Sequence, residues 1–126
     1  LTAKYMSPNT KVLLAEPINV DDTYKSFHSG ILTGVGKKKS IADGLLVSVG
    51  KLNFDIIKEN VEDVITVTEE EIVSAMRLIW ERMKIIIEPS SAVAMAAVIK
   101  SKSNLSGKRV GIIITGGNVD LSTLPF

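Results

Sequence analysis

A hydroxyl, two glycines and an amide follow directly on an apolar run near the end of the chain. The segment GIIITGGNVDL (111–121) places Thr115-Gly116-Gly117-Asn118 after three isoleucines. One interpretation is a tight strand-to-helix turn, in which the glycines adopt positive φ and Asn118 caps the turn. The other is a close backbone approach to a flat or anionic ligand, with the Thr115 hydroxyl directed at it. Neither G-x-G-x-x-G nor G-K-[ST] is present, so the loop matches no dinucleotide or Walker motif.

Two carboxylates form a second candidate site. Glu16 and Asp22 lie six residues apart in EPINVDD (16–22). Hard divalent cations bind carboxylate and carbonyl oxygens in loops of this kind. The alternative is that Asp21 and Asp22 only cap the helix that follows.

The composition excludes several other chemistries. The chain has no cysteine and one histidine, which excludes disulfides, thiolate catalysis and Cys-rich or His-rich metal sites. His28 lies on a short polar helix and is expected at the surface. Fifteen basic and fourteen acidic residues are interleaved, a pattern that does not indicate nucleic acid or an anionic membrane as partner. No segment is typical of a membrane span or a signal peptide, so a cytoplasmic location is the default expectation.

Short strands and helices must position these residues. Strands are predicted at 11–15, ended by Glu16-Pro17, and at 64–68, with helices at 21–30 and 53–61 and a loop at 34–40. Thr68 and Glu71 form a capping box that begins a helix. Its predicted core stripe consists of Ile72, Ala75, Met76, Ile79, Trp80 and Met83. Pro89 opens a small, apolar helix over 90–99, and 109–114 is predicted as the last strand.

This alternation predicts an α/β fold. We expect an open parallel sheet with helices on both faces, formed by residues 1–126 as a single α/β unit. Ligands bind such sheets beyond the carboxyl ends of the strands. The loops after Glu16, after Thr68 and at 115–118 all lie at such ends, so both candidate sites fall where a ligand is expected.

Four motifs together resemble a known family. AEPINVDD (15–22), IADG (41–44), ERMKIIIEPSSAVAMAA (81–97) and GIIITGGNVDL (111–121) resemble the carboxyl-terminal part of the serine racemase and serine/threonine dehydratase family. These are pyridoxal-phosphate enzymes of fold type II, the tryptophan-synthase-β type. The resemblance implies that the chain is a portion of the large, cofactor-binding domain. It also implies racemisation or β-elimination of L-serine or a related β-hydroxy amino acid, which gives a keto acid and ammonia.

The resemblance assigns roles to individual residues. Thr115 matches the family's Ser or Cys that contacts the pyridine nitrogen of pyridoxal phosphate, and Gly116 belongs to the same cofactor-binding loop. Gly44 matches a backbone position near the cofactor, and Glu88 matches a carboxylate near the ring. A threonine at 115 departs from the family but keeps the hydroxyl. Because a neutral hydroxyl cannot hold the ring nitrogen protonated, it favours β-elimination or reprotonation over transamination.

Further matches imply other ligands. Glu16, the carbonyl of Val20, and Asp22 match a Mg²⁺ or Ca²⁺ site of the serine racemase branch. Lys84 and Asn118 match positions that contact a nucleotide effector, ATP, in some serine racemases. The resemblance also implies a homodimer.

The family's Schiff-base lysine is not found in these residues. No lysine lies in the family's S-x-K-x-R-G context, and the first residue is Leu1. We therefore expect that the lysine lies upstream, in a missing amino-terminal half, and that this chain alone is inactive. The alternative is a non-catalytic remnant that acts as a protein-interaction module. The 45% content of hydrophobic residues is consistent with apolar surface that packs against another chain or domain.

Overall fold

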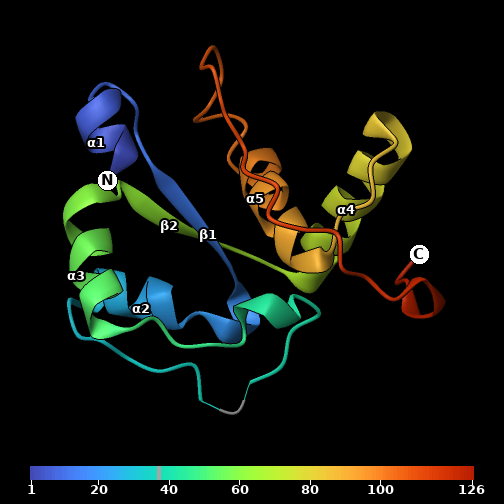
Figure 1. Cartoon of the computed structure of the whole chain (residues 1–126), viewed down its shortest axis with the longest axis horizontal. Coiled ribbons are helices and arrows are strands. Elements are labelled where there is room, and N and C mark those ends of the chain that lie inside the picture. The colour runs from blue at the N-terminus through green and yellow to red at the C-terminus, as the bar shows by residue number, and fades with distance from the viewer. Residues whose placement is uncertain (37) are drawn as a thin grey trace.

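Helices and two strands alternate along the chain in the computed structural model, which describes residues 1–36 and 38–126 (Figure 1). Lys37, in the loop predicted at 34–40, lies outside the described residues. In chain order the elements are α1 (Thr2–Met6), β1 (Leu13–Pro17), η1 (Ile18–Val20), α2 (Asp22–Ser29), η2 (Asp43–Leu45), α3 (Lys51–Asn60), β2 (Asp63–Val67), α4 (Glu69–Met83), α5 (Pro89–Lys100) and η3 (Leu121–Thr123). None of the described helices is long and apolar enough to cross a membrane.

The two strands pair in parallel. The register runs from Leu13 opposite Asp63 to Pro17 opposite Val67. β1 therefore continues through Glu16 and Pro17, which the sequence analysis expected to end it. Because the strands are parallel, the loops after Pro17 and after Val67 leave the sheet at the same edge.

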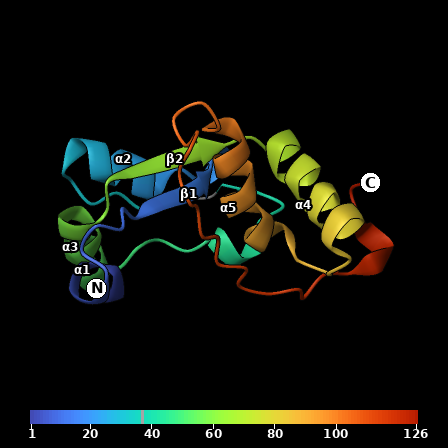
Figure 2. The ribbon, with the colours of Figure 1, turned by 90° about the horizontal axis from the view of Figure 1, so that it is seen from above.

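Helices cover both faces of this sheet. Ala15, Ile65 and Val67 point to one face and pack against a core built by α4 and α5. Val64, next along the strand, is 2% exposed and lies outside that cluster, as the alternation of strand side chains requires. α2 packs against β2, and α5 packs against both strands, as Figures 1 and 2 show from two directions. The α/β fold with a parallel sheet is thus confirmed.

The capping box predicted for α4 is present. The Thr68 hydroxyl accepts from the Glu71 backbone N–H at 3.2 Å, and the Glu71 carboxylate accepts from the Thr68 N–H at 2.8 Å. The predicted core stripe is largely confirmed, because Ile72, Ala75, Met76 and Ile79 are buried and Trp80 is half-buried. Met83 is the exception at 58% exposed. It lies in the last turn of α4, which leads away from α5 in Figure 1.

Residues 109–114 do not form the predicted strand. Their backbone is irregular, and within residues 1–36 and 38–126 the only sheet is the pair β1–β2. A strand requires a neighbouring strand to receive its hydrogen bonds, so the apolar run alone is not sufficient. Val110 and Ile113 are consequently 45% and 81% exposed.

Candidate functional site

The Thr115–Gly117 loop is held against the amino-terminal end of α5. The Ser91 hydroxyl, in the first turn of that helix, accepts hydrogen bonds from the backbone N–H of Thr115 at 3.1 Å and of Gly116 at 2.8 Å. The same oxygen lies 3.0 Å from the Thr115 hydroxyl and 2.8 Å from the Gly116 carbonyl oxygen. Ser91 is 1% exposed, whereas Thr115 is exposed. The buried Ser91 side chain thus holds the exposed loop through hydrogen bonds to the backbone of the loop.

Glu88 holds the same loop from the other side. Its backbone N–H donates to the Gly116 carbonyl at 3.1 Å, and its carboxylate accepts from the Asn118 N–H at 3.2 Å. A Cβ on Gly116 would lie 2.7 Å from this carboxylate, and a Cβ on Gly117 would lie 2.6 Å from the Ile86 carbonyl oxygen. At Gly117 the obstacle is backbone, so this position must carry glycine for the loop to lie this close to Ile86, whereas at Gly116 the Glu88 side chain would have to move aside.

Gly44 reaches the same helix end from a third segment. Its backbone N–H donates to the Ser90 hydroxyl at 3.1 Å and to the Asp43 carboxylate at 2.9 Å. A Cβ at Gly44 would lie 3.0 Å from the Ser90 oxygen. The residues predicted to bind the cofactor therefore gather around the first turn of α5: Gly44, Glu88, Thr115 and Gly116.

Ser90 and Ser91 were not among the predicted site residues. In the sequence they read only as small, polar residues in the first turn of a helix, after Pro89. Serine is common at that position, and nothing in the spacing indicates that each hydroxyl binds a different distant loop. The only signal in the sequence was that two adjacent serines stand in an otherwise apolar segment.

The carboxylate that accepts hydrogen bonds from the first backbone N–H groups of α2 is that of Glu16, and not that of Asp21 or Asp22. Its two oxygens accept from the backbone N–H groups of Thr23 at 3.1 Å and Tyr24 at 2.8 Å. Asp21 makes no capping hydrogen bond and instead pairs with Lys25 at 2.9 Å and Lys38 at 2.5 Å. The interpretation that the two aspartates only cap this helix is therefore wrong.

Asp22 is buried with one oxygen unsatisfied. Its side chain is 3% exposed, and its Oδ2 atom has no hydrogen-bond partner among the described residues. Burial raises the pKa of Asp22, against the opposing effect of backbone N–H groups, among them that of Val49. Burial likewise raises the pKa of Glu16, partly offset by its bonds from Tyr24 and Thr23. The negative charge of Asp22 raises the pKa of Glu16 further, so the two carboxylates repel each other.

This arrangement fits a cation. Two buried carboxylates and an unpartnered oxygen are the donors that Mg²⁺ and Ca²⁺ prefer, and a cation would offset the cost of burying the charges. Val20 lies between Glu16 and Asp22 in the sequence and is fully buried, and its carbonyl completes the predicted set of ligands. No three His, Cys, Asp or Glu side chains group together in the described part of the chain, so this site would rely on two carboxylates and a carbonyl.

Glu69 connects the cation loop to the segment that carries Gly44. Its carboxylate accepts from the Asn19 amide at 3.2 Å, the Ser40 hydroxyl at 2.8 Å and the Ile41 N–H at 2.9 Å. Glu69 was not among the residues singled out from the sequence. The structure shows that it also links two distant loops.

The two residues matched to a nucleotide effector lie in different segments of the chain. Lys84 follows α4 in a left-handed conformation, with φ of 59°, and its N–H donates to the Trp80 carbonyl. Asn118 is held by Glu88 through its backbone, which leaves its side chain for other contacts. Lys84 and Asn118 remain predictions, as does each cofactor and cation assignment.

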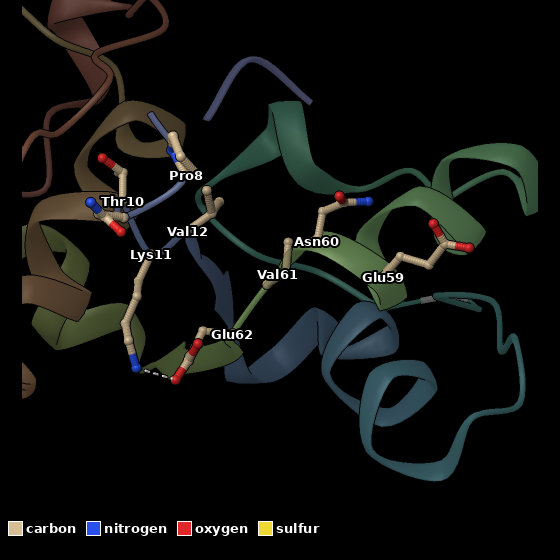
Figure 3. A pocket seen from close by; sticks show the side chains of 9 residues that line it. Pro8, Thr10, Lys11, Val12, Glu59, Asn60, Val61 and Glu62 are labelled. Carbon is tan, nitrogen blue, oxygen red and sulfur yellow. Dashed lines mark hydrogen bonds and ion pairs between the residues drawn. The ribbon is translucent and has the colours of Figure 1, made fainter. Parts of the chain in front are cut away.

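An open pocket of about 460 Å³ lies elsewhere, at the amino-terminal ends of the strands (Figure 3). It is lined by residues 8–12 and 59–62, and its edge carries the ion pair between Lys11 and Glu62. His28 is exposed, as expected, with its ring 2.9 Å from the Tyr24 carbonyl. Neither feature lies at the edge of the sheet where the candidate residues gather.

Comparison with known proteins identifies the family. The model of the family described as pyridoxal-phosphate dependent enzymes matches residues 1–116. The chain belongs to this family. The match includes every segment that surrounds the first turn of α5, up to and including Gly116.

Individual relatives narrow the similarity within the family. The chain is 58% identical to a serine racemase from Dictyostelium discoideum and 45% identical to a β-hydroxyaspartate dehydratase from Paracoccus denitrificans, over 98% and 100% of its length. It spans about 40% of the length of these curated relatives. The structure of maize serine racemase superposes with a TM-score of 0.91 at 37% identity, over 98% of this chain and 39% of that one.

Proposed function

We propose that the chain is a carboxyl-terminal portion of the cofactor-binding large domain of a pyridoxal-phosphate-dependent serine racemase or serine/threonine dehydratase. The proposed reaction is racemisation or β-elimination of L-serine or a related β-hydroxy amino acid. The observation that carries the proposal is the loop at 115–117, where Gly117 leaves no room for a side chain and the exposed Thr115 is anchored through Ser91. The similarity to a serine racemase and to a β-hydroxyaspartate dehydratase supports this class of substrate.

The residues around α5 fit the flat ring of the cofactor. Gly116, Gly117 and Gly44 lack a Cβ where one would lie 2.7, 2.6 and 3.0 Å from neighbouring atoms, so their backbone packs closely around the start of α5. Thr115 offers a neutral hydroxyl to the ring nitrogen, and Glu88 supplies a carboxylate beside the same loop. When bound, pyridoxal phosphate withdraws electrons from the α-carbon of the amino acid. A hydroxyl binds the ring nitrogen without protonating it, which moderates that withdrawal and suits elimination or reprotonation.

Further components belong to the same proposal. Glu16, the Val20 carbonyl and Asp22 would hold Mg²⁺ or Ca²⁺, and the unpartnered Asp22 oxygen supports this set. Lys84 and Asn118 would contact ATP as an effector. We further propose a homodimer in the cytoplasm, with the Schiff-base lysine supplied by residues outside this chain.

The test is cofactor binding and turnover by the natural protein. It should bind pyridoxal phosphate, seen as a visible absorbance band, and convert L-serine to D-serine or to pyruvate and ammonia. Thr115→Val should weaken binding of the cofactor, whereas Thr123→Val, a matched change in η3, should not. A natural protein that binds no cofactor would refute the proposal and favour the alternative of a protein-interaction module.

A further inference from the structure

The Ser91 hydroxyl has more neighbours than it has hydrogen-bonding capacity. Four polar atoms lie within 3.1 Å of its oxygen: two backbone N–H groups, one carbonyl oxygen and one hydroxyl oxygen. A serine hydroxyl has one proton to donate and two lone pairs that accept. How these are shared decides the direction of the hydrogen bonds in the loop.

The two backbone groups occupy both lone pairs. An N–H can only donate, so the amides of Thr115 and Gly116 must each use one acceptor position on Ser91. Ser91 then has only its proton left, and this goes to the Gly116 carbonyl at 2.8 Å or to the Thr115 hydroxyl oxygen at 3.0 Å. In neither arrangement can Ser91 accept the proton of the Thr115 hydroxyl.

The Thr115 proton is therefore left for an acceptor outside the loop. Within residues 1–36 and 38–126, Ser91 is the only hydrogen-bond partner of the Thr115 side chain. The side chain that could have accepted the Thr115 proton is saturated, and the residue itself is exposed. When Ser91 donates to Thr115, the polarised hydroxyl also becomes a stronger donor.

We propose that Ser91 is a positioning residue that fixes Thr115 as a hydrogen-bond donor towards an unprotonated ring nitrogen. This inference rests on the proposed function, because it requires that Thr115 face the cofactor. Ser91 does not contact the ring; it acts through the backbone and hydroxyl of Thr115. It would thus contribute to keeping the ring nitrogen a hydrogen-bond acceptor.

Two measurements on the natural protein test this role. The first uses cofactor-free protein and follows amide hydrogen exchange in the peptide that covers 111–121. Ser91→Ala should make the amides of Thr115 and Gly116 exchange roughly fivefold faster, since each loses a hydrogen bond of ordinary strength. Ser91→Cys, which keeps the shape but accepts poorly, should do the same. Ser101→Ala, at the other end of α5, should leave this peptide unchanged.

The second measurement uses pyridoxal phosphate labelled with ¹⁵N in the ring. Thr115→Val and Ser91→Ala should each move the ring-nitrogen resonance towards that of a nitrogen that accepts no hydrogen bond. In the double variant the shift should equal that of Thr115→Val alone, because Ser91 can influence the ring nitrogen only by positioning the Thr115 hydroxyl, which that variant already lacks. A role of Ser91 in general stability would instead give additive effects.

The outcomes separate this inference from the function on which it rests. If the unmodified protein binds no pyridoxal phosphate, the proposed function fails, whatever the exchange experiment gives. If it binds the cofactor and Ser91→Ala and Ser91→Cys leave exchange at 111–121 unchanged, the Ser91 role is refuted. If exchange rises but the ring-nitrogen resonance stays, Ser91 orders the loop without orienting Thr115, and the inference is again wrong.

Discussion

Replacing either of two adjacent aspartates should separate a cation site from ordinary surface charge. Asp22 is buried, and one of its oxygens has no partner among residues 1–36 and 38–126, whereas Asp21 is already paired with Lys25 and Lys38. We expect Asp22→Asn to abolish the stabilisation by Mg²⁺ or Ca²⁺, and Asp21→Asn to retain it. The two variants remove the same charge from neighbouring positions, so each is the control for the other.

The expected magnitudes differ enough to measure. A cation that binds only the folded state raises the free energy of unfolding by about 2.7 kcal/mol at a hundredfold excess over its dissociation constant. Asp21→Asn should lower the cation-free stability by at most about 1 kcal/mol, because the side chains of its lysine partners are 56% and 38% exposed and water screens both pairs. Asp22→Asn should not lower the cation-free stability, because it removes a buried charge that repels Glu16.

Denaturant unfolding at fixed cation concentrations measures these free energies directly. The gain from the cation should disappear at low pH. The folded-state pKa values of Asp22 and Glu16 are raised above their ordinary values of 3.8 and 4.5, mainly by burial. The stability that the protonated forms of Asp22 and Glu16 contribute to the folded state is therefore complete below pH 3.8 and 4.5, respectively. It is lost as pH rises through the folded-state pKa values. The cation should offset that loss, so its effect should grow with pH over the same interval.

Two results would refute this reasoning. If unfolding of the unmodified protein does not respond to Mg²⁺ or Ca²⁺ at neutral pH, there is no cation site at Glu16 and Asp22. If Asp22→Asn and Asp21→Asn retain the response equally, the cation binds elsewhere. In either case the unpartnered oxygen of Asp22 would need another explanation.

The loop and the start of α4 give further predictions. Thr115→Asp should raise the basicity of the bound cofactor's ring nitrogen, shift the cofactor's visible absorbance and slow β-elimination. Thr115→Ser, which keeps the hydroxyl, should leave the spectrum and the rate close to normal. An unchanged spectrum in Thr115→Asp would show that residue 115 does not face the ring. Gly116→Ala should weaken cofactor binding, measured by titration, with a smaller effect when Glu88→Ala removes the carboxylate 2.7 Å from the new Cβ. Gly117→Ala meets a backbone oxygen at 2.6 Å and should cost about 1–3 kcal/mol of unfolding free energy. Thr68→Ala should cost about 1 kcal/mol in the same denaturant assay, because it removes the capping box.

Local signals in the sequence predicted the starts of α4 and α5 and the end of α2, whereas α1 (Thr2–Met6) was not predicted. The capping box at Thr68 and the proline at position 89 specify helix starts through their own backbone contacts, and α4 and α5 begin where these signals lie. Gly30 ends α2 with φ of 73°, a conformation that glycine adopts readily. Each of these signals acts within a few residues, so the sequence alone is sufficient to interpret it.

Features that depend on distant partners were predicted less well. The apolar run at 109–114 has the composition of a strand, but a strand also needs a neighbour, and none pairs with it in the described residues. Glu16 was predicted as a cation ligand, and its bonds to Thr23 and Tyr24 across the loop were not foreseen. The resemblance to a family supplied the site residues, while Ser91, which holds two of them, carried no signal of its own.

The amino-terminal end of α5 explains how two distant segments of the chain meet. Successive helical residues point about 100° apart, so Ser90 and Ser91 reach different neighbours, Gly44 and the loop at 115–116. Glu88, the residue just before the helix, holds the same loop at 116–118. The Glu88 side chain makes no capping bond to its own helix, which leaves its carboxylate for Asn118. Glu69 links the loop after β1 to this arrangement, because its carboxylate accepts from Asn19 on one side and from Ile41 on the other. Through Glu69 the segment that carries Gly44 is coupled to Asn19, whereas the backbone of Thr115 is held by Ser91 of α5 itself.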